Sequence, residues 1–331
     1  MKQIKLGLPK GSLNAIGRGN THQIFTNAGY DIKGYQPGKE SDKDLNIVND
    51  QEILPLLTRP QSAPVELTRD LLDVAIVGKD WVDEESVNIK GNKITRVGDL
   101  EYGQTRLVIA IQNNVPFESI EEFFKAQKDR KKPILCFTEY PNLTRKYFMK
   151  QKAYQKVFGN KRPLVQVRGL VDGENKLCQI INSDGVTEGY MAKGADLIVD
   201  NTQTGSTLKK YGLKELETIM ESSSGLYAGP GCTGWKKEKA KEIFGLLYGA
   251  VAGRRFFDVK FNVLNDELEK VSKYLISEKL CSNEPTVSRG EKYSAVNVMM
   301  PRKKFPETLR ILRQKFKASA IVRAEVKQFI A

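Results

Sequence analysis

Histidine is nearly absent from this chain of 331 residues, which contains only His22. The residue precedes Gln23-Ile24-Phe25 in a segment with a helical pattern, so we expect it on the exposed side of a helix. Histidine is a frequent general base and the commonest transition-metal ligand, and metal sites built on it need several. Most hydrolase mechanisms and transition-metal centres are therefore excluded.

Cysteine is scarce as well, with four residues and no pair at CxxC spacing. This scatter argues against a zinc site and indicates reduced thiols in the cytoplasm. Long apolar runs are also missing, because no stretch approaches the ~20 residues that a membrane span needs. Residues 1–8 are too short and too interrupted for a signal peptide, and predict a first strand. We therefore expect a cytoplasmic globular protein with no membrane partner.

Positive charge is in excess, with 53 Lys and Arg against 40 Asp and Glu and a formal net charge of +13. A positive field speeds the association of anionic ligands such as nucleotides and phosphosugars. Basic clusters at 128–132, 236–241 and 302–304 also suit nucleic acid. Elsewhere basic residues alternate with acids and are not interleaved with aromatics, which favours a solvated surface. We expect small anionic substrates and no nucleic-acid partner.

The first 234 residues alternate short apolar strands with helical segments, the pattern of parallel α/β sheets. Strands are predicted at 3–8, 45–48, 73–78, 107–111, 134–137, 164–167, 196–200 and 213–220, and helices at 12–27, 143–152 and from 185. Prolines make 49–69 too broken for one long helix. The segment 169–184 is predicted to be irregular, and 225–234 to be a glycine-rich crossing. This organisation predicts two lobes with a cleft between them.

After residue 234 the order of predicted elements changes. A helix at 236–253 leads to an alternating strand at 256–264, a helix to 277 capped by Asn265, and strands at 285–288 and 294–299. A helix at 306–316 and a strand at 319–330 complete the series. The order β-α-β-β-α-β is the ferredoxin-like arrangement. No catalytic constellation is visible in it, so we expect a regulatory or oligomerising domain.

The stretch 196–212 has the most informative chemistry. An apolar run ends at Asp200, and a loop rich in hydroxyls and amides leads through Gly205 into a helical pattern. Free N–H groups and the dipole at a helix start favour an anion, and the hydroxyls of Thr204, Ser206 and Thr207 add donors. The alternative interpretation is an ordinary helix cap.

A second turn, Lys10-Gly11, follows the first predicted strand. Glycine permits close backbone approach, and the lysine beside it can meet a phosphate. The alternative is a plain turn with a surface lysine.

Taken together, these pieces resemble the ATP phosphoribosyltransferases, in their long form with a C-terminal regulatory domain. The matching residues are 8–13, 28–30, 77–81, 138–144, 199–200, 204–208, 212–213 and 284–288, in the same order along the chain. The resemblance implies a two-lobed catalytic region like the periplasmic binding proteins, followed by the ferredoxin-like domain. It implies a first lobe at 1–112 and 213–234, a second lobe at 113–212, and a linker helix with the regulatory domain at 235–331.

The resemblance also implies the reaction, in which adenine N1 of ATP attacks phosphoribosyl pyrophosphate and pyrophosphate leaves, the first step of histidine biosynthesis. Catalytic roles are implied for Lys10, Glu188 and Asp200. Phosphoribosyl pyrophosphate is expected on Gly11, Asp200, Asn201, Thr202, Gln203, Thr204, Gly205, Ser206 and Thr207, and ATP on Arg106, Glu139 and Tyr140. Such chemistry needs positioning and charge neutralisation by Mg²⁺, held mainly by the substrates, and by basic side chains. Two alternatives stay open, a helix-side cap for Asp200 and a pair with a surface acid for Arg106.

For the last domain the resemblance implies feedback inhibition by histidine at Asn262, Thr286 and Ser288, and a homo-oligomer, dimeric or hexameric. Many relatives have an acid near Asn262, whereas an asparagine offers only a neutral acceptor to an ammonium group. The chain departs from the family at 59–64, where a carboxylate is missing, and 172–184 is longer than usual.

Three rival hypotheses remain. A solute-binding protein has a similar two-lobed architecture, and a non-catalytic regulatory paralogue would have kept the lobes and lost the activity. The net charge alone suggests a nucleic-acid-binding protein.

Overall fold

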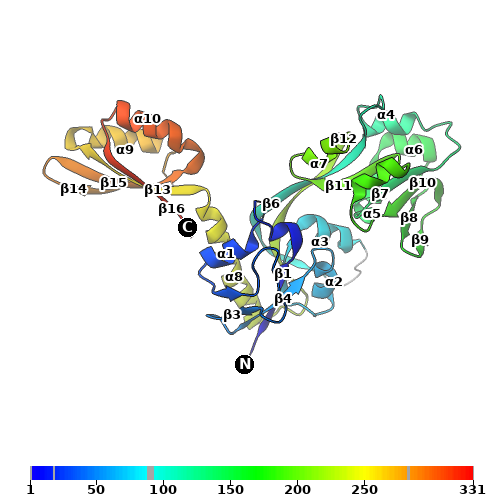
Figure 1. The fold of residues 1–331 in the computed structure, drawn as a ribbon, viewed down its shortest axis with the longest axis horizontal. Helices are drawn as coiled ribbons and strands as arrows, with labels where there is room; N and C mark the ends of the chain where they lie inside the picture. Colours follow the sequence, from blue (N-terminus) through cyan, green and yellow to red (C-terminus); the bar gives the residue numbers. More distant parts are fainter. Residues whose placement is uncertain (1, 18, 88–92, 282–283, 331) are drawn as a thin grey trace.

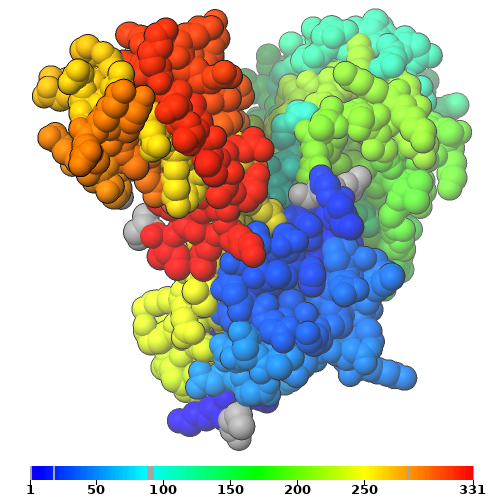
Figure 2. Space-filling model, turned by 60° about the vertical axis from the view of Figure 1, so that its left-hand side comes forward, coloured from blue at the N-terminus to red at the C-terminus, as the bar shows by residue number. Residues whose placement is uncertain are grey.

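The structure, a computed structural model, describes residues 2–17, 19–87, 93–281 and 284–330. Figure 1 shows two lobes and, at the opposite end of the molecule from the second lobe, a separate C-terminal domain. In the space-filling view, the C-terminal domain and the second lobe stand as distinct masses above the first lobe (Figure 2). Across the described residues, no helix combines the length and the apolar character that crossing a membrane requires.

A mixed sheet of ten strands extends through both lobes. Its strands are β1 (Ile4–Pro9), β4 (Ile53–Thr58), β5 (Val74–Gly78), β6 (Thr95–Gln112), β7 (Ile134–Thr138), β8 (Pro163–Val167), β9 (Leu170–Asp172), β10 (Asn175–Asn182), β11 (Leu197–Thr202) and β12 (Leu213–Ala228). The strand order is β4-β1-β5-β12-β6-β11-β7-β10-β8-β9. A small separate pair consists of β2 (Ile32–Lys33) and β3 (Asn46–Ile47), shorter than the strand predicted at 45–48.

Two long antiparallel strands, β6 and β12, join the lobes. They pair with each other, while β12 also pairs with β5 in the first lobe and β6 with β11 in the second. Only their halves in the second lobe, 107–111 and 213–220, were predicted as strands. The remaining halves carry charged and hydroxyl residues and several register shifts, so apolar alternation is lost there. Gly225 lies inside β12, so the prediction of a crossing that begins at this glycine was wrong.

Helices cover both faces of the sheet. They are α1 (Thr21–Asn27), α2 (Ala63–Thr68), α3 (Lys79–Ser86), α4 (Ile120–Lys125), α5 (Pro141–Lys150), α6 (Lys152–Phe158), α7 (Ser206–Lys210) and α8 (Trp235–Gly253), with 3₁₀ turns η1 (Gly11–Leu13) and η2 (Thr187–Lys193). Phe25 of α1 and Leu247 of α8 belong to the core of the first lobe, and Phe124 of α4 and Phe148 of α5 to that of the second. β6 contributes to both cores. The proposed lobe boundaries stay a prediction.

Two further predictions about the lobes were wrong. The helix predicted at 12–27 is two separate pieces, η1 and α1. A Cβ at Gly19 would lie 2.1 Å from the carbonyl oxygen of Leu13, so the chain folds back at this glycine; Arg18 lies outside the described residues. The segment predicted to be irregular at 169–184 contains β9 and β10. Buried Cys178 and Ile180 alternate along β10, but the polar residues around them mask the pattern.

The C-terminal domain has the ferredoxin-like topology predicted from the sequence. It contains β13 (Phe256–Leu264), η3 (Asn265–Glu267), α9 (Leu268–Ser277), β14 (Thr286–Arg289), β15 (Tyr293–Pro301), η4 (Arg302–Lys304), α10 (Phe305–Gln314) and β16 (Ser319–Glu325), with the sheet order β14-β15-β13-β16. Phe257, Val259, Phe261 and Val263 of β13 are all buried against residues of the two helices, as the alternating pattern predicts.

Two details of this domain differ from the prediction. The side chain of Asn265 does not cap the helix, because its amide donates to the carbonyls of Gly290 and Glu291 in the neighbouring loop. The last strand ends at Glu325 rather than 330, because the following residues turn back along α8, where the Phe329 N–H donates to the Gly249 carbonyl at 2.8 Å. The C-terminal tail therefore helps to tie this domain to the first lobe.

Candidate active site

The carboxyl ends of three strands, β1, β5 and β11, open onto one cleft of about 560 Å³ between the lobes. The first-lobe wall includes Ser12, Leu13 and Asp80, and the second-lobe wall includes Glu188 and the residues from Asn201 to Thr207 except Gly205. Ligands of open α/β sheets bind at this edge, where the strand order leaves a crevice. The predicted phosphate loop therefore borders the same cavity as Ser12 and Leu13, which follow the predicted Lys10-Gly11 turn; Lys10 and Gly11 themselves do not line it.

The loop after β11 is held by a hydroxyl group of its own segment and by one from β6. Thr202 Oγ1 accepts the Gly205 N–H at 2.8 Å, and the Thr202 carbonyl accepts the Thr105 hydroxyl at 3.1 Å. Gly205 has φ +71°, and a Cβ there would lie 2.7 Å from Glu215 Oε1. The helix that follows, α7, has only five residues, so its dipole is small. The hydroxyls and amides of the loop, more than a helix dipole, must supply any affinity for an anion.

On the first-lobe side the chain is open toward the cleft. Gly11 has φ +78° and nothing within 4 Å of the position of a Cβ. Its neighbours Ser12 and Leu13 line the cleft, and so does Pro60 from the unusual 59–64 segment. The Lys10 N–H donates to the Thr58 carbonyl at 2.9 Å, which ties this turn to the end of β4. A substrate phosphate can therefore approach the backbone of this turn closely.

Three carboxyl groups lie near one another in the second lobe, and of these only Glu188 lines the cleft. Burial, and then the negative charges of Glu188 and Glu139, raise the pKa of Asp200 to about 7. Burial also raises the pKa of Glu139, with Asp184 adding to the effect. Carboxylates crowded in this way favour ligands that bring hydrogen-bond donors or positive charge. Within the residues that the structure describes, no group of three or more His, Cys, Asp or Glu side chains is arranged to hold a metal ion.

A hydrogen-bonded cluster that the sequence analysis missed is centred on Asp80, at the start of α3. Asp80 Oδ2 accepts the Tyr140 hydroxyl at 2.8 Å and the Asn201 amide at 2.9 Å, both from the second lobe. The Trp81 ring packs on that of Tyr140 with centroids 4.3 Å apart. Asp80 lies in segment 77–81, which resembles the family and lies at the end of a predicted strand, and this position was the one indication of the cluster in the sequence.

None of the three predicted ATP residues lines the main cleft. Arg106 forms a two-pronged ion pair with Glu215, at 2.7 and 3.1 Å, so the structure contains the pair with an acid that was the alternative for this residue. Tyr140 is 1% exposed, and Glu139 lies near Asp200.

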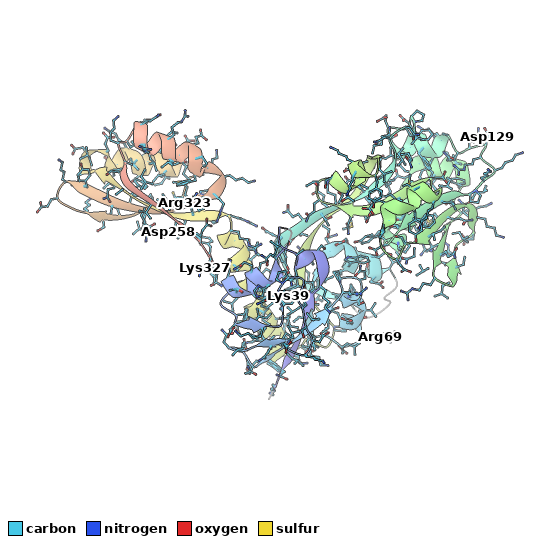
Figure 3. All side chains as sticks on the ribbon, in the orientation of Figure 1. Lys39, Arg69, Asp129, Asp258, Arg323 and Lys327 are labelled. Carbon is cyan, nitrogen blue, oxygen red and sulfur yellow. The ribbon has the colours of Figure 1, made fainter. Side chains whose placement is uncertain are left out.

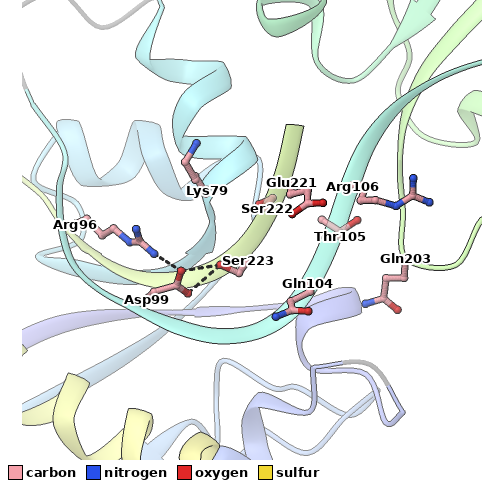
Figure 4. Close-up of a pocket in the computed structure, with 10 residues that line it drawn as sticks. All are labelled: Lys79, Arg96, Asp99, Gln104, Thr105, Arg106, Gln203, Glu221, Ser222 and Ser223. Carbon is pink, nitrogen blue, oxygen red and sulfur yellow. Dashed lines mark hydrogen bonds and ion pairs between the residues drawn. The ribbon is translucent and has the colours of Figure 1, made fainter. Parts of the chain in front are cut away.

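Arg106 also lines a second cavity, of about 450 Å³, on the β6 and β12 strands (Figure 4). Lys79, Arg96 and Asp99 line it too, and Arg96 pairs with Asp99 in the close-up. This cavity shares Thr105 and Gln203 with the main cleft. The protein thus offers two adjoining polar cavities at the junction of its lobes.

Two lobes joined by crossing strands, with a hydroxyl-rich loop at the cleft, define a class of two-lobed proteins that bind small anionic ligands. A model of the family described as ATP phosphoribosyltransferase matches residues 59–249 of the chain. The chain belongs to the ATP phosphoribosyltransferase family. This membership confirms the resemblance. It also confirms that the protein is a phosphoribosyltransferase that catalyses the first step of histidine biosynthesis, and it contradicts the hypothesis of a solute-binding protein.

Curated relatives align along nearly the whole chain. The chain is 30% identical over 321 residues to "ATP phosphoribosyltransferase" of Thermodesulfovibrio yellowstonii, covering 93% of this chain and 92% of the relative. It is 29% identical to the protein of the same name from Desulforudis audaxviator, covering 94% of each. Among solved structures, a chain of the "ATP phosphoribosyl transferase (HisG:HisZ) complex from Thermotoga maritima" superposes with a TM-score of 0.52 and 21% identity. The match covers 76% of this chain and 99% of that chain, and it supports the fold.

Proposed function

We propose that this chain forms phosphoribosyl-ATP at the junction of its lobes, with the phosphoribosyl donor on residues 200–207. The observation that carries the assignment is the hydroxyl-rich loop, which lines the same cleft as Ser12 and Leu13 directly after the Gly11 turn. In this arrangement the loop binds the 5′-phosphate, Asp200 accepts the ribose hydroxyls, and Glu188 lies beside them. Lys10 and Gly11 meet the leaving pyrophosphate from the first lobe, so that both negative groups of the donor have partners.

For ATP, the adjoining cavity offers a second subsite, which a reaction between two polyanions requires. Thr105 and Gln203 border both cavities, so groups bound in the two lie close enough to react. Arg106 would meet the nucleotide phosphates only by sharing its guanidinium with Glu215. Glu139 remains a proposed ATP contact, and Tyr140, buried beneath Trp81, supports the cleft wall from behind.

Enzymes of this family generally use a divalent metal, and we propose Mg²⁺. The described residues do not fit a protein-held metal site, because no group of three ligating side chains is arranged for one. A pyrophosphate supplies hard oxygen ligands itself, and Mg²⁺ is often bound through substrate phosphates. The ion therefore fits best as part of the substrate complex, with the cleft residues orienting the ribose.

Regulation by histidine is proposed for the sheet face of the C-terminal domain that α9 and α10 leave uncovered. Cross-strand pairing places Asn262 opposite Ala295, and Ala295 opposite Ser288, while Thr286 pairs with Asn297 in the next row. These residues alternate with the buried residues of β13, so they share the uncovered face. The three predicted effector residues, which lie on two non-adjacent strands, are thus neighbours on one surface.

An acid that the sequence analysis missed lies on the same face. Asp258 is on β13, four residues before Asn262, and Figure 3 labels it beside Arg323 on the same domain. Its Oδ1 atom is buried and has no hydrogen-bond partner among the described residues. The other oxygen, Oδ2, lies 3.6 Å from Lys260 Nζ. This face therefore carries a carboxylate that could exchange Lys260 for the ammonium group of an amino-acid effector, which the neutral Asn262 could not bind as an ion pair.

We further propose a homo-oligomer, dimeric or hexameric, in the cytoplasm. The four cysteines are free, and three of them are buried. The uncovered C-terminal sheet face is a surface on which copies of the chain could meet. Size-exclusion chromatography with light scattering, with and without histidine, tests the assembly, and a monomer under both conditions would contradict it.

The ultraviolet absorbance of phosphoribosyl-ATP tests the proposed activity directly. The assay contains ATP, phosphoribosyl pyrophosphate and Mg²⁺, with and without histidine. We expect product, and less of it with histidine. No product under any condition contradicts the proposed activity, whereas product without sensitivity to histidine contradicts only the regulatory assignment.

The phosphate loop has its own test in Gly205→Val. A branched side chain here meets Glu215 and fills the loop, so we expect phosphoribosyl pyrophosphate to bind at least tenfold more weakly. Gly212→Val is a matched control, because Gly212 has a similar φ of +69° with open space around its Cβ position. Equal affinity in the two variants would show that residues 203–205 form only a turn.

A further inference from the structure

One carboxylate joins the two lobes and a crossing strand. Asp80 is 3% exposed, lies at the start of α3 in the first lobe, and lines the cleft. Besides the bonds from Tyr140 and Asn201 to its Oδ2, its Oδ1 accepts the Ser222 hydroxyl of β12 at 2.6 Å. The Asp80 N–H in turn donates to Ser222 Oγ at 3.1 Å. One side chain therefore holds the start of α5, the end of β11 and the middle of β12.

The chemistry of these bonds determines how Asn201 is oriented. A carboxylate accepts hydrogen bonds, so the amide nitrogen of Asn201, and not its oxygen, must face Asp80. Tyr140 also donates, because burial and then the charge of Asp80 keep the pKa of this phenol well above its ordinary value. Asn201 Oδ1 is left buried without a hydrogen-bond partner among the described residues. The Asn201 amide also donates to the Tyr140 hydroxyl, which itself donates to Asp80, so Asp80 holds this amide both directly and through Tyr140.

Asn201 is a link between Asp80 and the phosphate loop. Along β11 successive side chains point to opposite faces, so Asn201 faces Asp80 while Asp200 and Thr202 face the other way. Thr202 Oγ1 then accepts the Gly205 N–H, which shapes the loop. A clamp on Asn201 fixes the backbone on both sides of it, and with it the direction in which the loop begins.

We propose that Asp80 is a positioning residue for the phosphoribosyl donor, acting through Asn201 on the loop at 200–207. The inference rests on the function proposed for that loop. In this role Asp80 makes no contact with the substrate itself. It sets the loop in its binding geometry before the substrate arrives, and part of the affinity comes from that preorganisation.

A second buried acid provides a matched control. Glu84, one turn along α3, is also 3% exposed and also bonds across the lobes, accepting the N–H groups of Asn142 and Leu143 at 2.8 Å each. Its partners are at the start of α5 and not on β11. If the acids only hold the lobes together, changing either one should weaken substrate binding. If Asp80 positions the loop, changing Asp80 should weaken binding and changing Glu84 should not.

The test measures binding of phosphoribosyl pyrophosphate by fluorescence. Trp81 lines the cleft and packs on Tyr140, and Trp235 is the other tryptophan, so Trp235→Phe leaves one reporter in the full-length chain. In this background we expect Asp80→Asn to raise the dissociation constant at least tenfold, because one of its donors then faces an amide N–H. Glu84→Gln should stay within twofold. Equal effects of the two changes, or unchanged affinity in Asp80→Asn, would overturn the proposal.

A double-mutant cycle shows whether Asp80 acts through Asn201. Asn201→Ala alone should weaken binding, and adding Asp80→Asn should weaken it no further. If the fold-change of the double variant instead equals the product of the two single fold-changes, the proposal is overturned, because Asn201 then contributes independently of Asp80. If Asp80→Asn does not fold, Ser222→Ala takes its place in the cycle. The proposal is supported if Ser222→Ala weakens binding alone but weakens it no further when combined with Asn201→Ala. Wild-type affinity in Ser222→Ala overturns it.

Steady-state kinetics separate this inference from the proposed function. We expect the KM for phosphoribosyl pyrophosphate to rise in Asp80→Asn while kcat at saturation falls less than threefold. If the wild-type enzyme makes product and the KM of Asp80→Asn is unchanged, only the positioning role is refuted. A wild-type protein that neither binds the donor nor makes product refutes the proposed function as well.

Discussion

The first lobe is joined to its two neighbours in different ways. Besides the crossing strands β6 and β12, its contact with the second lobe includes two buried acids, Asp80 and Glu84, each accepting hydrogen bonds from groups across the junction. Its contact with the C-terminal domain includes an ion pair between Arg255, just after α8, and Glu101 of β6. The side chains of that pair are 47% and 39% exposed. One junction is therefore dry and directional, and the other is partly open to water.

The difference in exposure between the two junctions indicates which pair of domains is held in a fixed relative position. Removing one partner of a buried hydrogen bond leaves the other unsatisfied, which costs about 1–3 kcal/mol per group. An exposed ion pair is screened by water and contributes about 0–1 kcal/mol. We therefore expect the catalytic lobes to be held in one relative position by polar contacts, and the C-terminal domain to depend more on apolar packing and its tail.

The largest effect should come from Glu84→Ala. Two N–H groups at the start of α5 lose their acceptor, and the Leu143 N–H is buried, so we expect a loss of about 3 kcal/mol in the free energy of unfolding. Urea unfolding followed by circular dichroism measures this loss. Glu85→Ala removes an acid from the same helix and should cost less than about 1 kcal/mol. Similar losses in the two variants would mean that the lobe junction is not held by these bonds.

The same contrast explains how much of the fold was predictable. β13 was predicted with its observed bounds because Phe257, Val259, Phe261 and Val263 alternate over a local antiparallel sheet. The first-lobe half of β12 was not, since Glu221 and three serines follow one another where the strand passes between lobes. Hydrophobic alternation marks strands that bury one face, and it fails where a strand borders a polar cleft.

The candidate site was predictable to the same extent. The loop at 200–207 could be found because its composition, hydroxyls with a glycine after an apolar run, is contiguous. The Asp80 cluster could not, because its partners Tyr140 and Asn201 lie 60 and 121 residues away. A hydrogen bond between distant segments leaves no local pattern, so only the folded chain reveals it.

The second-largest expected effect is on how the free energy of unfolding depends on pH. Burial raises the pKa of Glu84 from 4.5 to about 7 in the folded protein. The folded state thus holds the proton more tightly than the unfolded state, so stability falls as pH rises from about 4.5 to 7. Relative to Glu84→Gln, the wild type should lose about 2 kcal/mol between pH 5 and pH 7.5. Parallel pH profiles of the two proteins in urea unfolding would contradict this prediction.

A smaller effect is expected at the other junction from Arg254→Met. The Arg254 guanidinium donates to the carbonyls of Gly19 and Asn20 at 3.3 and 3.5 Å, and burial lowers its pKa. Methionine keeps the apolar stem and removes these long hydrogen bonds, so we expect a loss of about 1 kcal/mol. Differential scanning calorimetry measures it. A loss as large as that of Glu84→Ala would make the two junctions equivalent.

The smallest effect should come from Arg255→Ala. Its exposed pair with Glu101 should contribute less than about 1 kcal/mol, and less still in 0.5 M NaCl, where exposed charges are screened. Glu101 also has a φ of +56°, a backbone conformation that glycine adopts without strain. Glu101→Gly should therefore leave stability nearly unchanged, since relief of the backbone offsets the lost pair. If Arg255→Ala instead costs as much as Glu84→Ala in the same calorimetric series, exposure is the wrong criterion for ranking the two junctions.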